Sequence, residues 1–129
     1  MDTRSKILSP AAAGQLAGQL PPNSVTVVTG YFDVLRAEHT RDLREVRERA
    51  PAQPLLVVVL PLAGELLQQR ARAELVAALH MVDYVVITDE TDAAGLIASL
   101  KPAALVRLEG ADVRRIRQLT EHVHRRQTS

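Results

Sequence analysis

Hydrophobic residues gather in four short continuous runs, separated by longer segments in which they recur every three or four positions. Continuous runs of aliphatic and β-branched residues are typical of strands buried on both faces of a parallel sheet. We therefore predict four buried strands. They are Val25–Val28, Leu55–Leu60, Tyr84–Thr88 and Ala104–Leu108.

The segments between these runs have the period of amphipathic helices. Ser9 and Pro10 favour a leading helix as far as Leu20, because serine can accept a hydrogen bond from a free first-turn N–H and proline has none to satisfy. The residues expected to face the sheet from the later helices are Leu43, Val46 and Ala50; Leu66, Leu67, Leu75, Ala78 and Leu79; Leu96, Ile97 and Leu100; and, in a last helix over 112–125, Val113, Ile116, Leu119 and Val123.

Strands that alternate with helices imply right-handed crossovers and helices on both faces of one sheet. We therefore predict an α/β fold, a Rossmann-like doubly wound parallel sheet of about four or five strands. The 129 residues have the length of one domain. Within it we expect a leading helix and turn over 1–22 and an α/β core over 23–129.

Composition excludes several classes of function. The chain has no cysteine, which excludes disulfides, thiolate catalysis and cysteine-ligated zinc and fits a reducing cytoplasm. Its net charge is +1, and aromatic residues make up only 2% of it, so neither a basic surface nor base-stacking rings indicate nucleic-acid binding. The longest apolar run, Leu55–Leu60, is too short to span a bilayer. We expect a bacterial, cytoplasmic protein that contacts neither membrane nor nucleic acid.

Candidate chemistry lies where the first predicted strand ends, at Thr29 and Gly30. Ligands of open α/β sheets bind at the carboxyl ends of strands, near the point where the strand order reverses. A glycine there allows close approach of a phosphate, and a following helix N-terminus offers free N–H donors. His39, in the first turn of the next helix, can donate to a phosphate oxygen. The stretch from Tyr31 to His39 is therefore the expected site.

Two blocks of sequence resemble a known family. Gly30–His39, which reads GYFDVLRAEH, resembles the G-x-F-D-x-L-H-x-G-H signature of cytidylyltransferase-like nucleotidyltransferases. Within that superfamily it is most similar to the adenylyltransferase domain of bifunctional ADP-heptose synthase. Arg72–Val86, RAELVAALHMVDYVV, resembles that family's R-x-x-x-L-x-A-L-x-x-V-D-x-V-V segment. Thr3–Leu8 and Pro102–Val106 extend the resemblance over almost the whole chain.

The chain departs from the family pattern at key positions. The first histidine of the signature is Arg36 and the glycine between the histidines is Glu38, so that only His39 remains. The family's K-G-G-D reads Arg107–Gly110, RLEG, and its later S-T-T segment has no counterpart. Arginine preserves a cation. Glu38 instead places a carboxylate near the expected phosphates, and a unit charge pair about 4 Å apart is worth about 4 kcal/mol at an effective dielectric of 20.

The resemblance implies roles for particular residues. In an active enzyme, Arg36 and His39 would be catalytic, and Mg²⁺ would accompany ATP or CTP. The residues implied to contact the nucleotide are Thr29, Gly30, Tyr31, Phe32 and Arg72. Each has a simpler alternative: Arg36 can pair with Glu38 or Asp33, Arg72 can be a solvated helix arginine, and Asp33 can fix the turn. No residue pattern indicates a metal site.

We therefore expect a degenerate nucleotidyltransferase-like protein, without transferase activity, that is kept for nucleotide sensing or protein interaction. The alternative is an active adenylyl- or cytidylyltransferase that joins a nucleotide to a sugar phosphate. An uncovered edge of the sheet would favour a homodimer.

Overall fold

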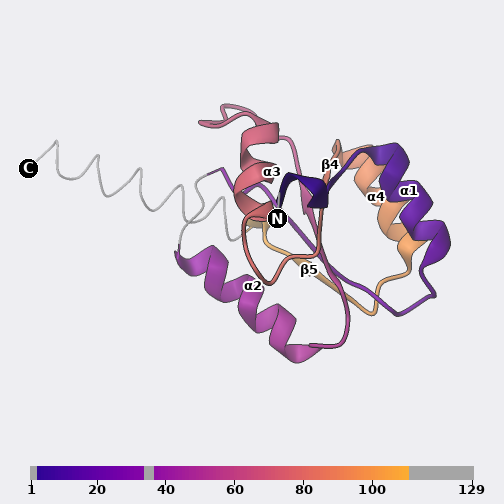
Figure 1. Ribbon diagram of the computed structural model, residues 1–129. Helices are drawn as coiled ribbons and strands as arrows, with labels where there is room; N and C mark the ends of the chain where they lie inside the picture. Colours follow the sequence, from indigo (N-terminus) through magenta and orange to yellow (C-terminus); the bar gives the residue numbers. More distant parts are fainter. Residues whose placement is uncertain (1–2, 34–36, 111–129) are drawn as a thin grey trace, which may run out of the picture.

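The computed structural model describes residues 3–33 and 37–110. Strands and helices alternate along the chain as predicted (Figure 1). The strands are β1 (Ile7–Leu8), β2 (Thr26–Gly30), β3 (Leu55–Val59), β4 (Tyr84–Ile87) and β5 (Ala104–Arg107). The helices are α1 (Pro10–Gln19), α2 (Ala37–Arg49), α3 (Gln69–Ala77) and α4 (Glu90–Leu100), preceded by a 3-10 helix over Thr3–Lys6.

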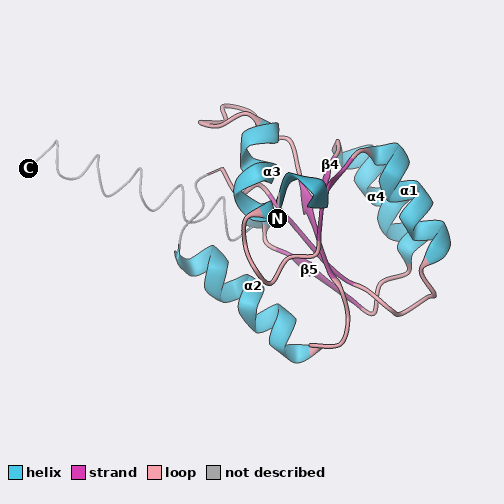
Figure 2. Cartoon of the chain, in the orientation of Figure 1, coloured by secondary structure: helices cyan, strands magenta, loops and turns pink. Residues whose placement is uncertain are grey.

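The strands form one parallel sheet in the order β1-β4-β3-β2-β5. Helices α2 and α3 lie on one face of this sheet, and α1 and α4 lie on the other (Figure 2). The predicted doubly wound α/β fold is thus confirmed. Sequence reasoning missed β1, which pairs Ile7 with Val85 and Leu8 with Val86, because two residues are too short to show a periodic pattern.

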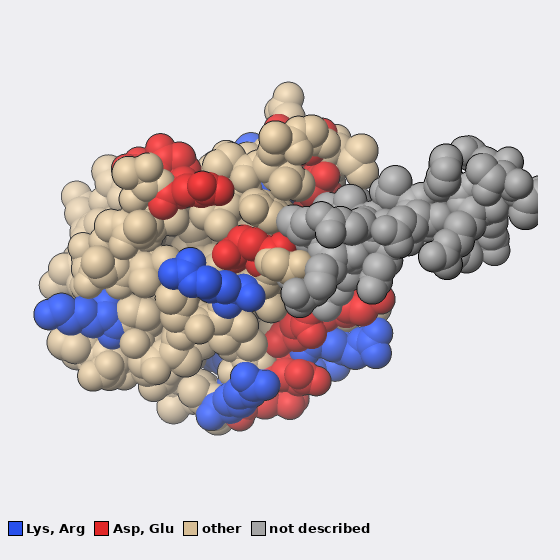
Figure 3. Space-filling model, turned by 180° about the vertical axis from the view of Figure 1, so that it is seen from behind, with Lys and Arg blue, Asp and Glu red and all other residues tan. Residues whose placement is uncertain are grey.

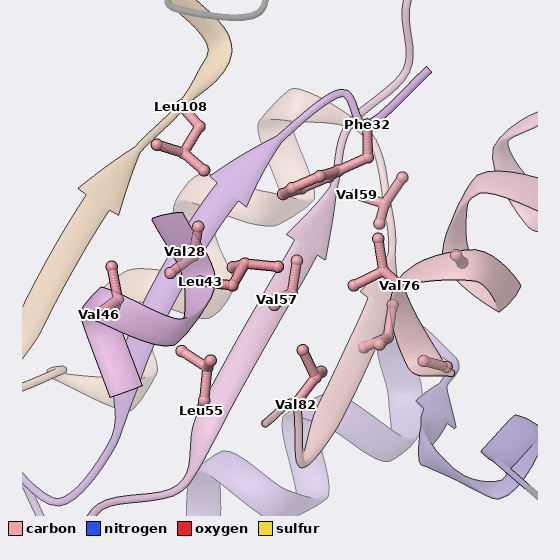
Figure 4. Close-up of a cluster of buried hydrophobic side chains, with 13 residues drawn as sticks. Val28, Phe32, Leu43, Val46, Leu55, Val57, Val59, Val76, Val82 and Leu108 are labelled. Atoms are coloured by element: carbon pink, nitrogen blue, oxygen red, sulfur yellow. The ribbon is translucent and has the colours of Figure 1, made fainter. Parts of the chain in front are cut away.

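The sheet separates two apolar layers, and neighbouring residues of each central strand serve different layers. Val57 of β3 packs in the cluster under α2 and α3 (Figure 4), whereas Leu56 and Val58 pack in the cluster under α1 and α4. Every residue of β2 and β3 is buried. This double covering explains why the sequence shows continuous apolar runs in place of alternation.

The leading helix begins as predicted. The Ser9 hydroxyl accepts a hydrogen bond from the Ala12 amide at 3.1 Å, and Pro10 is the first helical residue. Helix α4 begins in the same way, with the Asp89 carboxylate accepting from the Asp92 amide at 2.7 Å.

The apolar stripe predicted for the third helical segment was largely wrong, since of its five residues only Leu79 packs against the core. Leu66 and Leu67 precede α3 and are 77% and 37% exposed, and Leu75 is 42% exposed. The buried face of α3 instead carries Arg72 together with Ala73, Val76 and Ala77. A charged residue thus occupies a core position, which a hydrophobic pattern cannot indicate.

Two further predictions concern membranes and the end of the chain. Within the ranges 3–33 and 37–110, no helix combines the length and apolar character needed to cross a bilayer. The helix predicted over 112–125 lies outside the described residues.

Candidate functional site

The strand order reverses at β2. From β2 the chain proceeds through β3 to β4, and α4 then returns it to β5 on the opposite side of β2. A surface hollow of about 250 Å³ lies at this point, against the carboxyl ends of the strands, where open α/β sheets bind ligands. The lining residues come from strand ends and from α4: Thr29, Tyr31, Leu60, Glu90, Ala93, Ala94, Ile97, Arg107 and Glu109.

The hollow contains two of the residues that we predicted to bind nucleotide, Thr29 and Tyr31. The Thr29 hydroxyl donates a hydrogen bond to the carboxylate of Glu109, and the Thr29 carbonyl accepts from the Leu108 amide at 2.8 Å. These bonds fasten the segment after β5 to the end of β2. The Thr29 hydroxyl, which is the one β2 hydroxyl that lines the hollow, therefore already has a carboxylate partner.

The charge of the hollow is mixed. Glu90 and Glu109 contribute two carboxylates, and Arg107 contributes one guanidinium. Figure 3, which shows the molecule from behind, likewise has acidic and basic side chains beside one another, with wide uncharged areas between them. For a triphosphate, the two carboxylates are repulsive, and Arg107 is the one attractive charge among the described residues that line the hollow.

Gly30 and Phe32 have a packing role on the other face of the sheet, which α2 and α3 cover. A Cβ atom added at Gly30 would lie 2.7 Å from Cε2 and 2.9 Å from Cζ of Phe32, so only glycine leaves room for the ring. Phe32 is fully buried and has a φ of 52°, a left-handed conformation that is costly for a bulky residue. Figure 4 shows its ring turned back over the sheet beside Val59.

Gly30→Ala should therefore lower the free energy of unfolding by about 1–3 kcal/mol, because the new methyl group would press into the Phe32 ring. Urea denaturation of the purified protein measures this difference. Gly18→Ala is the matched control, since no atom lies within 4 Å of a Cβ at that helical position. The control should gain about 0.5–1 kcal/mol from helix propensity, and equal behaviour of the two variants would contradict the packing role of Gly30.

His39 lies in the first turn of α2, as predicted, but it is buried. Its ring lies 5.5 Å from the Phe32 ring, centroid to centroid, at an interplanar angle of 55°. Glu38 beside it is exposed and does not line the hollow. Arg36, the other predicted catalytic residue, lies outside the described residues.

Asp33 connects the turn after β2 to the loop after β3. Its buried carboxylate accepts hydrogen bonds from the Leu66 amide, at 2.8 and 3.0 Å, and from the Leu67 amide, at 2.9 Å. The structure therefore supports the role expected for Asp33, which is the fixing of the turn. The loop over 61–68 is held in place by this carboxylate.

Arg72 also binds the loop over 61–68. Its side chain is fully buried, and Nη1 donates to the carbonyls of Tyr31 at 2.7 Å and Leu60 at 2.8 Å. Nε donates to the Leu67 carbonyl at 3.1 Å, and Nη2 donates to the Glu65 carboxylate at 2.5 Å. The alternative of a solvated helix arginine is thus wrong. Because this guanidinium is fully buried, a phosphate could reach it only if the groups around it moved aside.

Sequence reasoning missed three residues that shape this edge of the sheet. Glu65 neutralises Arg72, and Glu109 binds Thr29. Gln69 donates through Nε2 to the carbonyls of Val59 and Thr88, both at 2.9 Å, and so joins the ends of β3 and β4. No sequence signal distinguishes an acidic or amide residue that binds a distant segment from one that is solvated. The departure from K-G-G-D was the one indication of Glu109.

Several known proteins are similar in sequence to this chain. The bifunctional protein HldE of Geobacter sulfurreducens is 34% identical over 116 aligned positions, which cover 82% of this chain. That of Campylobacter curvus is 32% identical over 142 aligned positions, or 96% of the chain. The chain is a relative of HldE. The HldE of Campylobacter concisus, at 37% identity over 76% of the chain, agrees. No family model matches the chain.

The match covers one part of each HldE protein. The chain spans 23%, 30% and 22% of the lengths of these three relatives. The resemblance to the nucleotidyltransferase superfamily and to ADP-heptose synthase, which the motifs in Gly30–His39 and Arg72–Val86 indicated, is confirmed. As a relative of HldE, the chain combines a nucleotidyltransferase-like fold with a carboxylate-bearing hollow at the switch point.

Proposed function

We propose that this nucleotidyltransferase-like domain lacks transferase activity and is kept for nucleotide sensing or for protein interaction, in the cytoplasm. The observation that carries the first part of the proposal, the lack of transferase activity, is the contact between Thr29 and Glu109. The phosphates of a nucleotide would be expected in the hollow at the switch point. There the Glu109 carboxylate already accepts a hydrogen bond from the Thr29 hydroxyl. A triphosphate placed there would meet that negative charge, and Glu90 adds a second.

The placement of Arg72 supports the same proposal. Transition-state charge at a transferring phosphoryl group is stabilised by cations that point at it. The guanidinium of Arg72 is instead surrounded by three carbonyls and the Glu65 carboxylate. The hydrogen bonds of Arg72 therefore stabilise the loops of the protein and not a bound ligand.

The alternative is an active adenylyl- or cytidylyltransferase, and the presence of Arg107 in the hollow favours it. In that reaction an oxygen of a sugar phosphate would attack the α-phosphorus of ATP or CTP, and pyrophosphate would leave. Mg²⁺ would accompany the triphosphate, and Arg36, His39 and Arg72 would stabilise the developing charge. This role would require Arg72 to leave Glu65.

Thermal unfolding with and without Mg²⁺ and ATP or CTP tests the nucleotide role. A nucleotide at a hundred times its dissociation constant adds about 2.7 kcal/mol to stability. Glu109→Gln should increase the shift, because it removes a charge from the hollow, whereas Glu74→Gln, at an exposed position of α3, should leave the shift unchanged. If no nucleotide stabilises either protein, the interaction role remains.

Pyrophosphate release with a heptose phosphate and each nucleotide tests the absence of transferase activity. We expect no release above that of a blank without protein. Release by the wild-type protein that is lost in His39→Ala would establish the active alternative in place of our proposal.

We also propose a homodimer formed through β5. This strand ends the described sheet, and Ala104, Leu105 and Arg107 on it are exposed. Such an edge presents unpaired backbone groups that a second copy can pair with. Sedimentation equilibrium would show a concentration-dependent dimer, and a monomer at all concentrations would refute the proposal.

A further inference from the structure

An apolar surface lies on α3 and on the end of the loop that precedes it. Among the described residues, the large hydrophobic side chains that are exposed are Leu66, Leu67, Leu75 and Leu105, and the first three belong to this part of the chain. Figure 1 shows the loop and α3 on the outside of the molecule, away from α1 and α4. We refer to Leu66, Leu67, Ala71 and Leu75 as the leucine surface.

The protein holds the loop leucines in a fixed arrangement. The Asp33 carboxylate accepts from the amides of Leu66 and Leu67, and Arg72 donates to the Leu67 carbonyl. Single hydrophobic residues scattered over a surface are normal, whereas several that gather on one element indicate an interaction site. A surface that is ordered in advance also loses less conformational entropy when a partner binds. The leucine surface therefore has the character of a docking surface.

The charges beside the leucine surface indicate what docks there. Arg70 and Glu74 of α3 have side chains that are 58% and 44% exposed, and their mutual contact at 3.4 Å is a weak one. From its N-terminus to its C-terminus, the exposed side of α3 thus presents a cation and then an anion. An antiparallel copy of the helix presents them in the opposite order. Arg70 of each copy then faces Glu74 of the other, which is the self-complementarity that a twofold contact requires.

The same antiparallel arrangement brings the leucines together. A twofold axis at the level of residue 72, midway between Arg70 and Glu74, places Leu75 of one copy at the level of residue 69 of the other. Leu67 of that copy is two residues further, or about 3 Å along the helix axis. Ala71 lies one turn before Leu75, and its small side chain leaves room for the two helices to approach each other. Apolar contact and charge pairing therefore favour one and the same arrangement.

We propose that the leucine surface docks a second copy of this chain, with the two α3 helices antiparallel and Arg70 of each copy paired with Glu74 of the other. This contact goes beyond the roles proposed above, because it depends on neither nucleotide binding nor pairing through β5. Helix α3 lies against β1, β3 and β4, whereas β5 is at the other end of the sheet. The two interfaces can therefore form independently.

Sedimentation equilibrium of the Leu105→Lys variant tests the α3 interface by itself, because a charge on β5 disfavours pairing of that edge. We expect a monomer–dimer equilibrium with a dissociation constant of about 0.1 mM, the range of a small, transient interface. Adding Leu75→Glu should weaken the dimer at least about tenfold, since it places a charge against apolar side chains. Ala98→Glu, at an exposed position of α4 on the other face of the sheet, is the matched control and should leave the dimer unchanged.

Reversal of single charges, in the same Leu105→Lys chain, identifies the partner. Arg70→Glu and Glu74→Arg should each weaken self-association about tenfold or more, because like charges then face each other in both contacts. An equal mixture of these two variants should associate as tightly as the parent chain, because unlike charges then meet in both contacts. A parent chain that stays monomeric, a dimer that Leu75→Glu leaves unchanged, or a mixture that does not associate would each overturn the proposal. The first result would mean that the leucine surface docks a different protein.

Discussion

Arg72→Ala should lower the free energy of unfolding by about 3–5 kcal/mol, because it leaves several backbone carbonyls without their donor at about 1–3 kcal/mol for each buried one, while the loss of the pair with the partly exposed Glu65 adds little. The side chain is fully buried, and it donates to three backbone carbonyls as well as to Glu65. Its removal would leave the carbonyls of Tyr31 and Leu60 without these donors in the protein interior. Urea denaturation, analysed by linear extrapolation, measures the difference.

Arg70→Ala is the matched control for this experiment. Arg70 lies on the same helix and pairs with Glu74 at 3.4 Å, but both side chains are largely exposed, so the loss should be no more than about 0.5 kcal/mol. Arg72→Lys should lie between the two, because a lysine keeps the charge but lacks the planar fork of donors. A loss of about 1 kcal/mol or less for Arg72→Ala would contradict the buried clamp and would make a phosphate-binding role for Arg72 the better explanation.

Asp33→Ala should lower the free energy of unfolding by about 2–4 kcal/mol and should release the loop over 61–68. Its carboxylate accepts from the amides of Leu66 and Leu67, and hydrogen bonds to a charged group contribute about 1.5–3 kcal/mol each. Native-state hydrogen exchange reports on this loop directly. We expect both amides to lose most of their protection in the variant.

Asp33→Asn is the companion variant, because its amide retains one oxygen that can accept a hydrogen bond. It should lose less stability than Asp33→Ala and should keep partial protection at Leu67. Unchanged protection of both amides in Asp33→Ala would show that other contacts hold the loop. Because Arg72 also holds Leu67, through its carbonyl, the losses from Arg72→Ala and Asp33→Ala should not add.

These two residues show why the exposed leucines do not collapse into the core. Leu66 is 77% exposed, yet its amide is fixed by Asp33. The loop is therefore held by backbone hydrogen bonds to a carboxylate and a guanidinium, and not by burial of its apolar side chains. A hydrophobic pattern counts the leucines and predicts the opposite.

Much of the fold could be predicted from local pattern. Two layers of helices bury both faces of the sheet, so β2 and β3 are continuous apolar runs that can be recognised without knowledge of their neighbours. Ser9 and Pro10 likewise determine the start of α1 through contacts within one helical turn. By contrast, β1 is a strand only because β4 lies next to it.

The site was predicted less well, for a physical reason that applies to each of its residues. The sequence by itself determined that a buried strand ends at Thr29 and Gly30 before a helix, which is the kind of edge where open α/β sheets bind ligands. Only the tertiary structure decided what its polar groups do. Thr29 meets Glu109 across 80 positions and Arg72 meets Tyr31 across 41. A charged or polar side chain is fixed by whichever partner the fold brings within hydrogen-bond distance, and no local pattern contains that partner.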